Sequence, residues 1–180
     1  MTTAVGGDRD VADGAERRRV RRATADDIGS LVRLRARMLT DMGVDVGGED
    51  AAWRSAAADW FAERMARGDG FAAFVVDDPE LGVVACAVGA CDAHAPGPAG
   101  PSGLYGHVSN VCTDPRRRRR GHARACMDAL LAWFRDETPV SVVGLNATGD
   151  GTALYESFGF APPRFPYLQF RPEREAPPAG

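Results

Sequence analysis

The stretch "DPRRRRRGHARACMDALLAWF", residues 114–134, places five consecutive arginines directly before a glycine and an apolar, periodic segment. Apolar residues recur there at spacings of three and four, which predicts a helix with one face on a core. This stripe consists of Ala123, Cys126, Met127, Leu130, Leu131 and Phe134. The arginines would lie in the loop before the helix. They fit either a nucleic-acid patch or a cradle for a phosphorylated ligand.

The position of the arginine run favours the phosphate cradle. The segment "LYGHVSNVCT", residues 104–113, is a predicted strand that leads straight into the loop. Free N–H groups at a helix start, helped by the helix dipole, form an anion site. Gly121 has no side chain, so a phosphate could approach the backbone there, and arginines at the rim would add charge.

Composition restricts the class of protein. The 180 residues carry a formal net charge of −3, and the pI is ≈ 5.6. Nucleic-acid-binding domains usually have a pI above about 9, so we expect no nucleic-acid partner. No stretch approaches the roughly 20 apolar residues of a membrane span, so we expect no membrane partner. The N-terminus lacks an apolar signal region, which favours a cytoplasmic protein.

The cysteines and histidines give no metal pattern. The four cysteines are Cys86, Cys91, Cys112 and Cys126, and no two of them form a C-x-x-C pair. The three histidines are not at the spacing of metal ligands either. We therefore predict small buried thiols and no metal site.

Hydrophobic periodicity predicts the element order β-α-α-β-β-β-α-β-α-β. The expected segments are a strand at 18–24, helices at 24–43 and 51–68, strands at 71–78, 83–93 and 104–113, the helix after the arginines, a strand at 139–147, a short helix at 151–160 and a last strand at 164–170. Pro166 would make that last strand an edge or a bulged strand. Residues 1–17 and 172–180 are polar or rich in Gly, Ala and Pro, and we expect a disordered N-terminal tail and a flexible C-terminal tail around one domain at 18–171.

The segment "NVCTDPRRRRRGHARACMDALL" resembles the acyl-CoA-binding motif of the GNAT superfamily of N-acetyltransferases. That motif, Arg/Gln-x-x-Gly-x-Gly/Ala, falls on Arg118, Gly121 and Ala123. A second signature of the family matches "LNATGDGTALYESFGF" at Tyr155, Gly159 and Phe160. The resemblance implies an α/β (α+β) fold. Its mixed, mostly antiparallel sheet would have splayed central parallel strands and helices on both faces.

The resemblance also implies acetyl-CoA as the cofactor. Its pantetheine arm would lie along the strand that ends at Thr113, and its pyrophosphate would lie at the helix start. The residues implied in cofactor binding are Val111, Cys112, Thr113, Arg118, Arg119, Arg120, Gly121, His122, Ala123, Arg124 and Asn146. The chain departs from the family at Thr148, because many members have an asparagine seven residues before the tyrosine.

The same resemblance implies direct attack of an amine on the thioester. Tyr155 would protonate the departing thiolate as general acid, and a backbone N–H near Val111 would stabilise the oxyanion. A packing role for Tyr155 is the alternative. His107 is the candidate general base, since histidine titrates near neutral pH, but it also fits a structural histidine of the strand.

The acceptor would be a small-molecule or peptide amine. Asp41, Asp45, Glu49 and Asp50 could attract a cationic amine, or they could form a solvated loop. Three functions stay open: an N-acetyltransferase, a noncatalytic acyl-CoA-binding regulatory domain, and a nucleic-acid-binding protein that uses the arginines. A homodimer is also left open.

Overall fold

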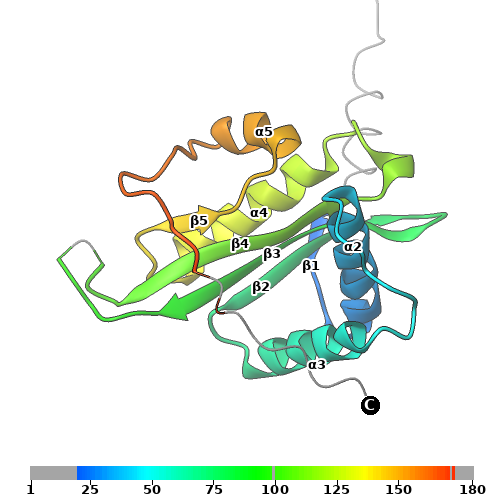
Figure 1. Ribbon diagram of the computed structural model, residues 1–180, viewed down its shortest axis with the longest axis horizontal. Helices are drawn as coiled ribbons and strands as arrows, with labels where there is room; N and C mark the ends of the chain where they lie inside the picture. Colours follow the sequence, from blue (N-terminus) through cyan, green and yellow to red (C-terminus); the bar gives the residue numbers. More distant parts are fainter. Residues whose placement is uncertain (1–19, 99, 171, 173–180) are drawn as a thin grey trace, which may run out of the picture.

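A computed structural model describes residues 20–98, 100–170 and 172, and these form a five-stranded sheet with helices on both faces (Figure 1). The strand order is β1-β2-β3-β4-β5, where β1 to β4 are antiparallel neighbours and β5 is parallel to β4. The strands are β1 (Val20–Arg22), β2 (Phe71–Asp78), β3 (Gly82–Ala93), β4 (Leu104–Thr113) and β5 (Val143–Leu145). The predicted fold class is confirmed.

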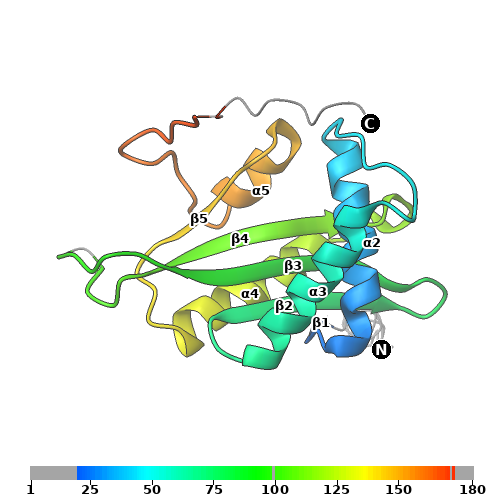
Figure 2. The ribbon, with the colours of Figure 1, turned by 60° about the horizontal axis from the view of Figure 1, so that its bottom comes forward.

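The helices cover both faces of the sheet. They are α2 (Ile28–Asp41), α3 (Ala52–Arg67), α4 (His122–Glu137) and α5 (Thr152–Glu156), with single 3-10 turns at η1 (Ala25–Asp27), η2 (Pro115–Arg117) and η3 (Gly149–Gly151). Figure 2 shows α2 and α3 in front of the sheet and α4 behind it. Each face therefore has its own core, one around Leu31, Leu34 and Phe61 and the other around Met127, Leu130 and Phe134. None of the described helices has the length and apolar character to span a membrane.

Helix α4 lies close to the sheet because two strands carry glycine beneath it. A Cβ atom built on Gly106 would come within 2.7 Å of Phe134, and one built on Gly89 would come within 2.8 Å of the same ring. Real Cβ atoms do not approach other atoms so closely, so larger residues at either site would displace α4. This close packing holds the C-terminal half of α4 against the sheet.

Strands β4 and β5 pair over a short length and then part. Gly106, His107 and Val108 pair with Val143, Gly144 and Leu145, and β4 continues alone to Thr113. On its other side, β4 carries a bulge, because Ala87 of β3 lies opposite both Asn110 and Val111. Asn110 has a left-handed backbone with φ 50°. The predicted separation of the parallel strands is present, and it opens beside the arginine loop.

The strand predicted at 164–170 is wrong. These residues form no strand, and Phe165, Tyr167, Leu168 and Phe170 are 76% to 87% exposed. The ring of Pro166 removes a backbone donor, and the apolar side chains of this segment stay exposed. As a result β5 is an edge strand in the described part of the chain, and it is shorter than the predicted 139–147. The two predicted tails lie almost entirely outside the described residues.

Candidate active site

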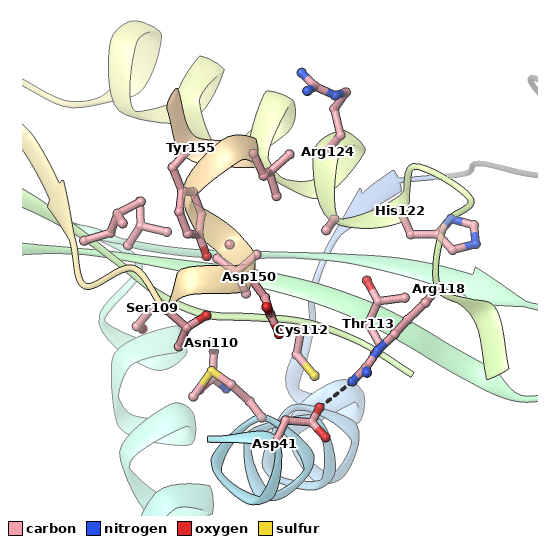
Figure 3. Close-up of a pocket in the computed structure, with 18 of the residues that line it drawn as sticks. Asp41, Ser109, Asn110, Cys112, Thr113, Arg118, His122, Arg124, Asp150 and Tyr155 are labelled. Carbon is pink, nitrogen blue, oxygen red and sulfur yellow. Dashed lines mark hydrogen bonds and ion pairs between the residues drawn. The ribbon is translucent and has the colours of Figure 1, made fainter. Parts of the chain in front are cut away.

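A cleft of ≈ 1210 Å³ opens where β4 and β5 separate (Figure 3). Its walls are the end of β4, the arginine loop, the start of α4, η3 with α5, and the end of α2. Most of the site residues predicted from sequence line it: Val111, Cys112, Thr113, Arg118, Arg119, Gly121, His122, Ala123, Arg124, Asn146 and Tyr155. Arg120 and His107 do not.

The start of α4 faces the cleft with backbone donors. Gly121 is the N-cap residue and adopts a left-handed conformation with φ 80°. No side chain caps this end of the helix. The N–H groups of Ala123 and Arg124 belong to the first turn, so they have no acceptor within the helix. Arg119 is also left-handed, with φ 65°, and successive amides in such turns form anion-binding concavities. The local geometry suits a phosphate group.

Three of the five arginines are engaged by carboxylates of the protein itself. Arg116 donates from Nε and Nη2 to Asp114, at 3.0 and 2.9 Å. Arg117 donates to Asp78 at 2.5 and 3.1 Å and to Glu80 at 2.6 Å. Arg118 forms an ion pair with Asp41 and donates to the Thr113 carbonyl at 3.1 Å. These three side chains fix the loop to the ends of β4, β2 and α2.

The hydrogen bonds hold the pKa of two of these carboxyl groups below the usual range. Arg117 lowers the pKa of Asp78 to about 2, and Arg116 lowers that of Asp114 to about 2. A free aspartate has a pKa of about 3.9, so the pairs stabilise the fold above that pH, and this stabilisation is lost as the pH falls towards 2. The loop is therefore held throughout the neutral range.

The remaining two arginines are different. Among the residues that the structure describes, Arg119 and Arg120 have neither an ion pair nor a side-chain hydrogen bond. Arg119 lines the cleft, and Arg120 is its exposed neighbour. The run thus divides into three arginines that hold the loop and two that are available to an anion.

We expect these two groups to respond differently to mutation. The double variant Arg119→Ala/Arg120→Ala should bind a phosphorylated ligand such as acetyl-CoA about 10- to 100-fold more weakly, because it loses charged hydrogen bonds, with little change in melting temperature. Arg117→Ala, the matched control, should lower the melting temperature by a few degrees and change affinity less. Calorimetry and thermal unfolding measure the two effects, and equal affinities in the two variants would contradict the division.

Beyond Val108, the edge of β4 that faces the cleft has no partner strand in the described chain. The Thr113 side chain adds an unusual group at the same edge. Its Oγ1 atom is buried and has no hydrogen-bond partner among the described residues. Buried polar atoms without partners are rare in folded proteins. Both features would suit an extended polar ligand at this edge.

Tyr155 projects from α5 into the cleft, and its hydroxyl points towards β4 (Figure 3). Its ring packs edge-on against Phe160, with centroids 6.2 Å apart. A Cβ atom on Gly151 would lie 2.8 Å from this ring, so the glycine leaves room for it. Burial raises the pKa of Tyr155 above its usual value of about 10, so the phenol keeps its proton at neutral pH.

The thiol of Cys112 is also at the cleft, but it is a poor nucleophile. Burial raises the pKa of Cys112 to about 11, and the thiolate is the reactive form. All four cysteines are free thiols; three are buried, as predicted, and Cys91 is half-buried. The described residues hold no cluster of side chains suited to a metal ion.

His107 is not at the cleft. It lies in the paired part of β4, opposite Ala90 of β3 and Gly144 of β5. The cleft lining does contain acidic residues, Asp41 and Asp150. Asp41 is engaged by Arg118 and by Arg37, whose Nη2 lies 2.7 Å from its Oδ1.

A comparison with models of protein families identifies the family of the chain. The model of the "Acetyltransferase (GNAT) family" matches residues 39–160, which is more than half of the chain. The chain belongs to the GNAT acetyltransferase family. The matched region contains both signatures recognised in the sequence and nearly all of the cleft.

Solved structures share this GNAT fold. A predicted acetyltransferase from Clostridium acetobutylicum, solved with acetyl-CoA, has a TM-score of 0.75 and 22% identity, covering 85% of this chain and 95% of its own. A GCN5-related N-acetyltransferase from Ralstonia eutropha JMP134 has a TM-score of 0.67 and 25% identity, with 84% and 97% coverage. Glucosamine-6-phosphate N-acetyltransferase from Arabidopsis thaliana has a TM-score of 0.65 and 15% identity, with 84% and 97% coverage. No match was found among curated protein sequences.

Several residues of this GNAT cleft were missed by the reading of the sequence: Met38, Met42, Ser109, Asn110 and Asp150. The two methionines are four residues apart at the end of α2, so they share a helix face, and that spacing was a usable signal. Asn110 carried no signal, because its importance comes from a bulge that only the pairing of β3 with β4 reveals.

Proposed function

We propose that this protein is an N-acetyltransferase that moves an acetyl group from acetyl-CoA to a primary amine by direct attack in a ternary complex. One observation carries the proposal. A single cleft combines an uncapped helix start beside two arginines without carboxylate partners, an unpaired strand edge, and a protonated tyrosine. When bound, acetyl-CoA supplies the acetyl group as an activated thioester.

The cradle fits the shape and charge of this cofactor. The backbone N–H groups of Ala123 and Arg124 would hold the pyrophosphate, with Arg119 and Arg120 at its rim. The open edge of β4 from Val111 to Thr113 would hydrogen-bond the pantetheine arm. Thr113 Oγ1, which has no partner among the described residues, could hydrogen-bond a polar group of the same arm. Asn146, which directly follows β5, also lines the cleft.

The catalytic groups of the proposal come from β4 and α5. The bulge at Asn110 and Val111 leaves an extra residue outside the regular ladder, and a backbone N–H there would stabilise negative charge on the acyl oxygen. Tyr155 holds a proton that the departing sulfur can take. Because His107 does not line the cleft, we infer that the acceptor amine loses its proton to water in the open cleft.

A covalent intermediate on Cys112 is the mechanistic alternative, and we expect it to be absent. With a pKa of about 11, this thiol is almost wholly protonated at pH 7.5, so Cys112→Ala should keep at least half of the wild-type kcat. Steady-state kinetics measures the effect, and a single-turnover reaction followed by mass spectrometry would reveal any acetylated protein. A loss of 100-fold or more in kcat, or an acetyl adduct that Cys112→Ala lacks, would contradict direct transfer.

Two measurements test the proposed function. Saturating acetyl-CoA should raise the melting temperature, because a ligand that binds only the folded state stabilises that state. At 100 times the Kd, the free energy of unfolding increases by about 2.7 kcal/mol. Free CoA should then appear when a panel of primary amines is added. A thermal shift without CoA release from any amine would favour a noncatalytic acyl-CoA-binding domain.

A nucleic-acid partner is disfavoured by the ion pairs of Arg116, Arg117 and Arg118 with the protein's own carboxylates. Salt-sensitive RNA or DNA binding that excess acetyl-CoA does not reduce would overturn this view. The proposed acceptor is a small molecule or a peptide, and the four free thiols support a reducing, cytoplasmic location.

A further inference from the structure

The end of α2 forms a wall of the cleft, and an arginine of the same helix lies beside the cleft, hydrogen-bonded to Asn110, which lines it. Met38 and Met42 line the cleft from this helix. Arg35 lies three residues before Met38 and seven before Met42, so the three residues share one helix face. The Arg35 side chain is half-buried there, next to the bulge of β4.

Arg35 is held by an amide rather than by a carboxylate. Its Nη1 atom donates to Asn110 Oδ1 at 2.8 Å. Asn110 is 2% exposed, has the left-handed φ of 50°, and donates from Nδ2 to the Leu31 carbonyl at 3.5 Å. Among the described residues, no carboxylate lies within ion-pair distance of Arg35. A guanidinium has five donors, so most of them are left for another group.

The other charges near this wall are already compensated. Asp41 is paired with Arg37 and Arg118, and Glu49, which was expected to attract a cationic amine, lies 3.7 Å from Arg54. Arg33, on the same helix, is paired with Asp114 at 3.7 Å. Among the described residues, Arg33 and Arg37 of α2 therefore have carboxylate partners, whereas Arg35 has none.

The opposite wall of the cleft carries a carboxylate. Asp150 lines the cleft from η3, which lies across β4 from α2 (Figure 3). It has no ion pair among the described residues. A ligand in the cleft with one cationic and one anionic end could meet Asp150 on one side and reach Arg35 beside Asn110 on the other.

We propose that Arg35 binds an anionic group of the acceptor, so that the acceptor is a primary amine that also bears a carboxylate or a phosphate. The guanidinium fork matches either oxyanion in a bidentate contact. Asn110 fixes the orientation of the fork beside the bulge where the acyl carbon would lie. This inference rests on the proposed acetyl transfer and narrows its acceptor class.

Matched acceptors test the inference. Release of CoA is measured at saturating acetyl-CoA for amino acids against their amides, and for O-phosphoethanolamine against ethanolamine. In the wild-type protein, kcat/KM should be at least tenfold higher for the charged member of one pair. The pair that shows the preference identifies the anion as carboxylate or phosphate.

The variant Arg35→Gln should reduce that ratio of kcat/KM values about 10- to 100-fold, as expected for lost charged hydrogen bonds. Arg35→Lys keeps the charge without the fork and should retain part of the preference. Arg64→Gln is the control. Arg64 is on α3, stacks on Trp60 at 5.3 Å and, unlike Arg35, has no hydrogen bond to a described residue that lines the cleft, so the wild-type ratio should persist.

The acetyl-CoA thermal shift, measured on every variant, distinguishes a failure of the acceptor inference from a failure of the proposed function. If the shift and CoA release are present but neither pair shows a preference, or Arg35→Gln leaves the ratio unchanged, the inference is overturned and the proposed function stands. The same holds if no amine with an anionic group is acetylated. If acetyl-CoA gives no shift, both the inference and the proposed function are overturned.

Discussion

Gly121→Asp is expected to abolish acetyl-CoA binding. The new carboxylate would lie at the N-cap of α4, beside the amides that are proposed to hold the pyrophosphate. Two unit charges of like sign about 4 Å apart repel by roughly 4 kcal/mol near a protein surface, before salt screening. We therefore expect at least a 100-fold loss of affinity, measured by calorimetry at low ionic strength.

The matched control for this variant is Gly121→Asn. Asparagine has nearly the same shape as aspartate, tolerates a left-handed backbone such as the φ of 80° here, and carries no charge. Its affinity should fall much less, and both variants should fold. If Gly121→Asp bound acetyl-CoA as tightly as Gly121→Asn does, the phosphate site would have to be placed elsewhere.

Tyr155→Phe is expected to lower kcat by about 100-fold while the Kd for acetyl-CoA stays within a few-fold of wild type. The hydroxyl points into the cleft, whereas the ring makes the packing contact with Phe160, and phenylalanine preserves that contact. Loss of the proton donor should therefore affect the chemical step and not the binding of the cofactor. Steady-state kinetics combined with calorimetry separates the two quantities.

The pH dependence gives a second measure of the role of Tyr155. Burial raises its pKa above about 10, so the phenol stays protonated below that pH, and its contribution to kcat should be constant from pH 6 to 9. The ratio of wild-type to Tyr155→Phe kcat should thus be flat over this range. Equal kcat in the two proteins at every pH would leave Tyr155 with a packing role only.

The sequence predicted the side of the cleft at the start of α4, proposed to bind the cofactor, better than the side at α2, proposed to bind the acceptor. Gly121, Ala123 and the arginines occupy fixed positions relative to a helix start, and local periodicity is enough to locate a helix start. Strand β2 was predicted with its observed bounds for the same reason, because its apolar run is short and ends at a turn.

The acceptor side depends on long-range contacts. The ion pair of Arg118 with Asp41 joins residues 77 positions apart, and the hydrogen bond of Arg35 to Asn110 joins residues 75 positions apart. The local sequence gives Arg37 a carboxylate partner, Asp41, four residues along the same helix, but it does not distinguish Arg35 from Arg33. Only the folded arrangement shows that, among the described residues, Arg33 has a carboxylate partner and Arg35 does not.

The last strand was overpredicted for a related reason. The segment at 164–170 is short and rich in aromatic residues, which favours a strand, but a strand also needs a neighbour with which to pair. In the structure this segment remains exposed beyond α5. The pattern alone cannot supply that neighbour.

The three arginines that fasten the loop have a consequence for the speed of binding. Arg116, Arg117 and Arg118 tie one short segment to β4, to the β2–β3 hairpin and to α2. The loop is thereby preorganised, and the entropy of ordering it is lost during folding instead of at each encounter with a ligand. Association would then be governed by diffusion and by electrostatic steering towards Arg119 and Arg120, with no slow closing step before the complex forms.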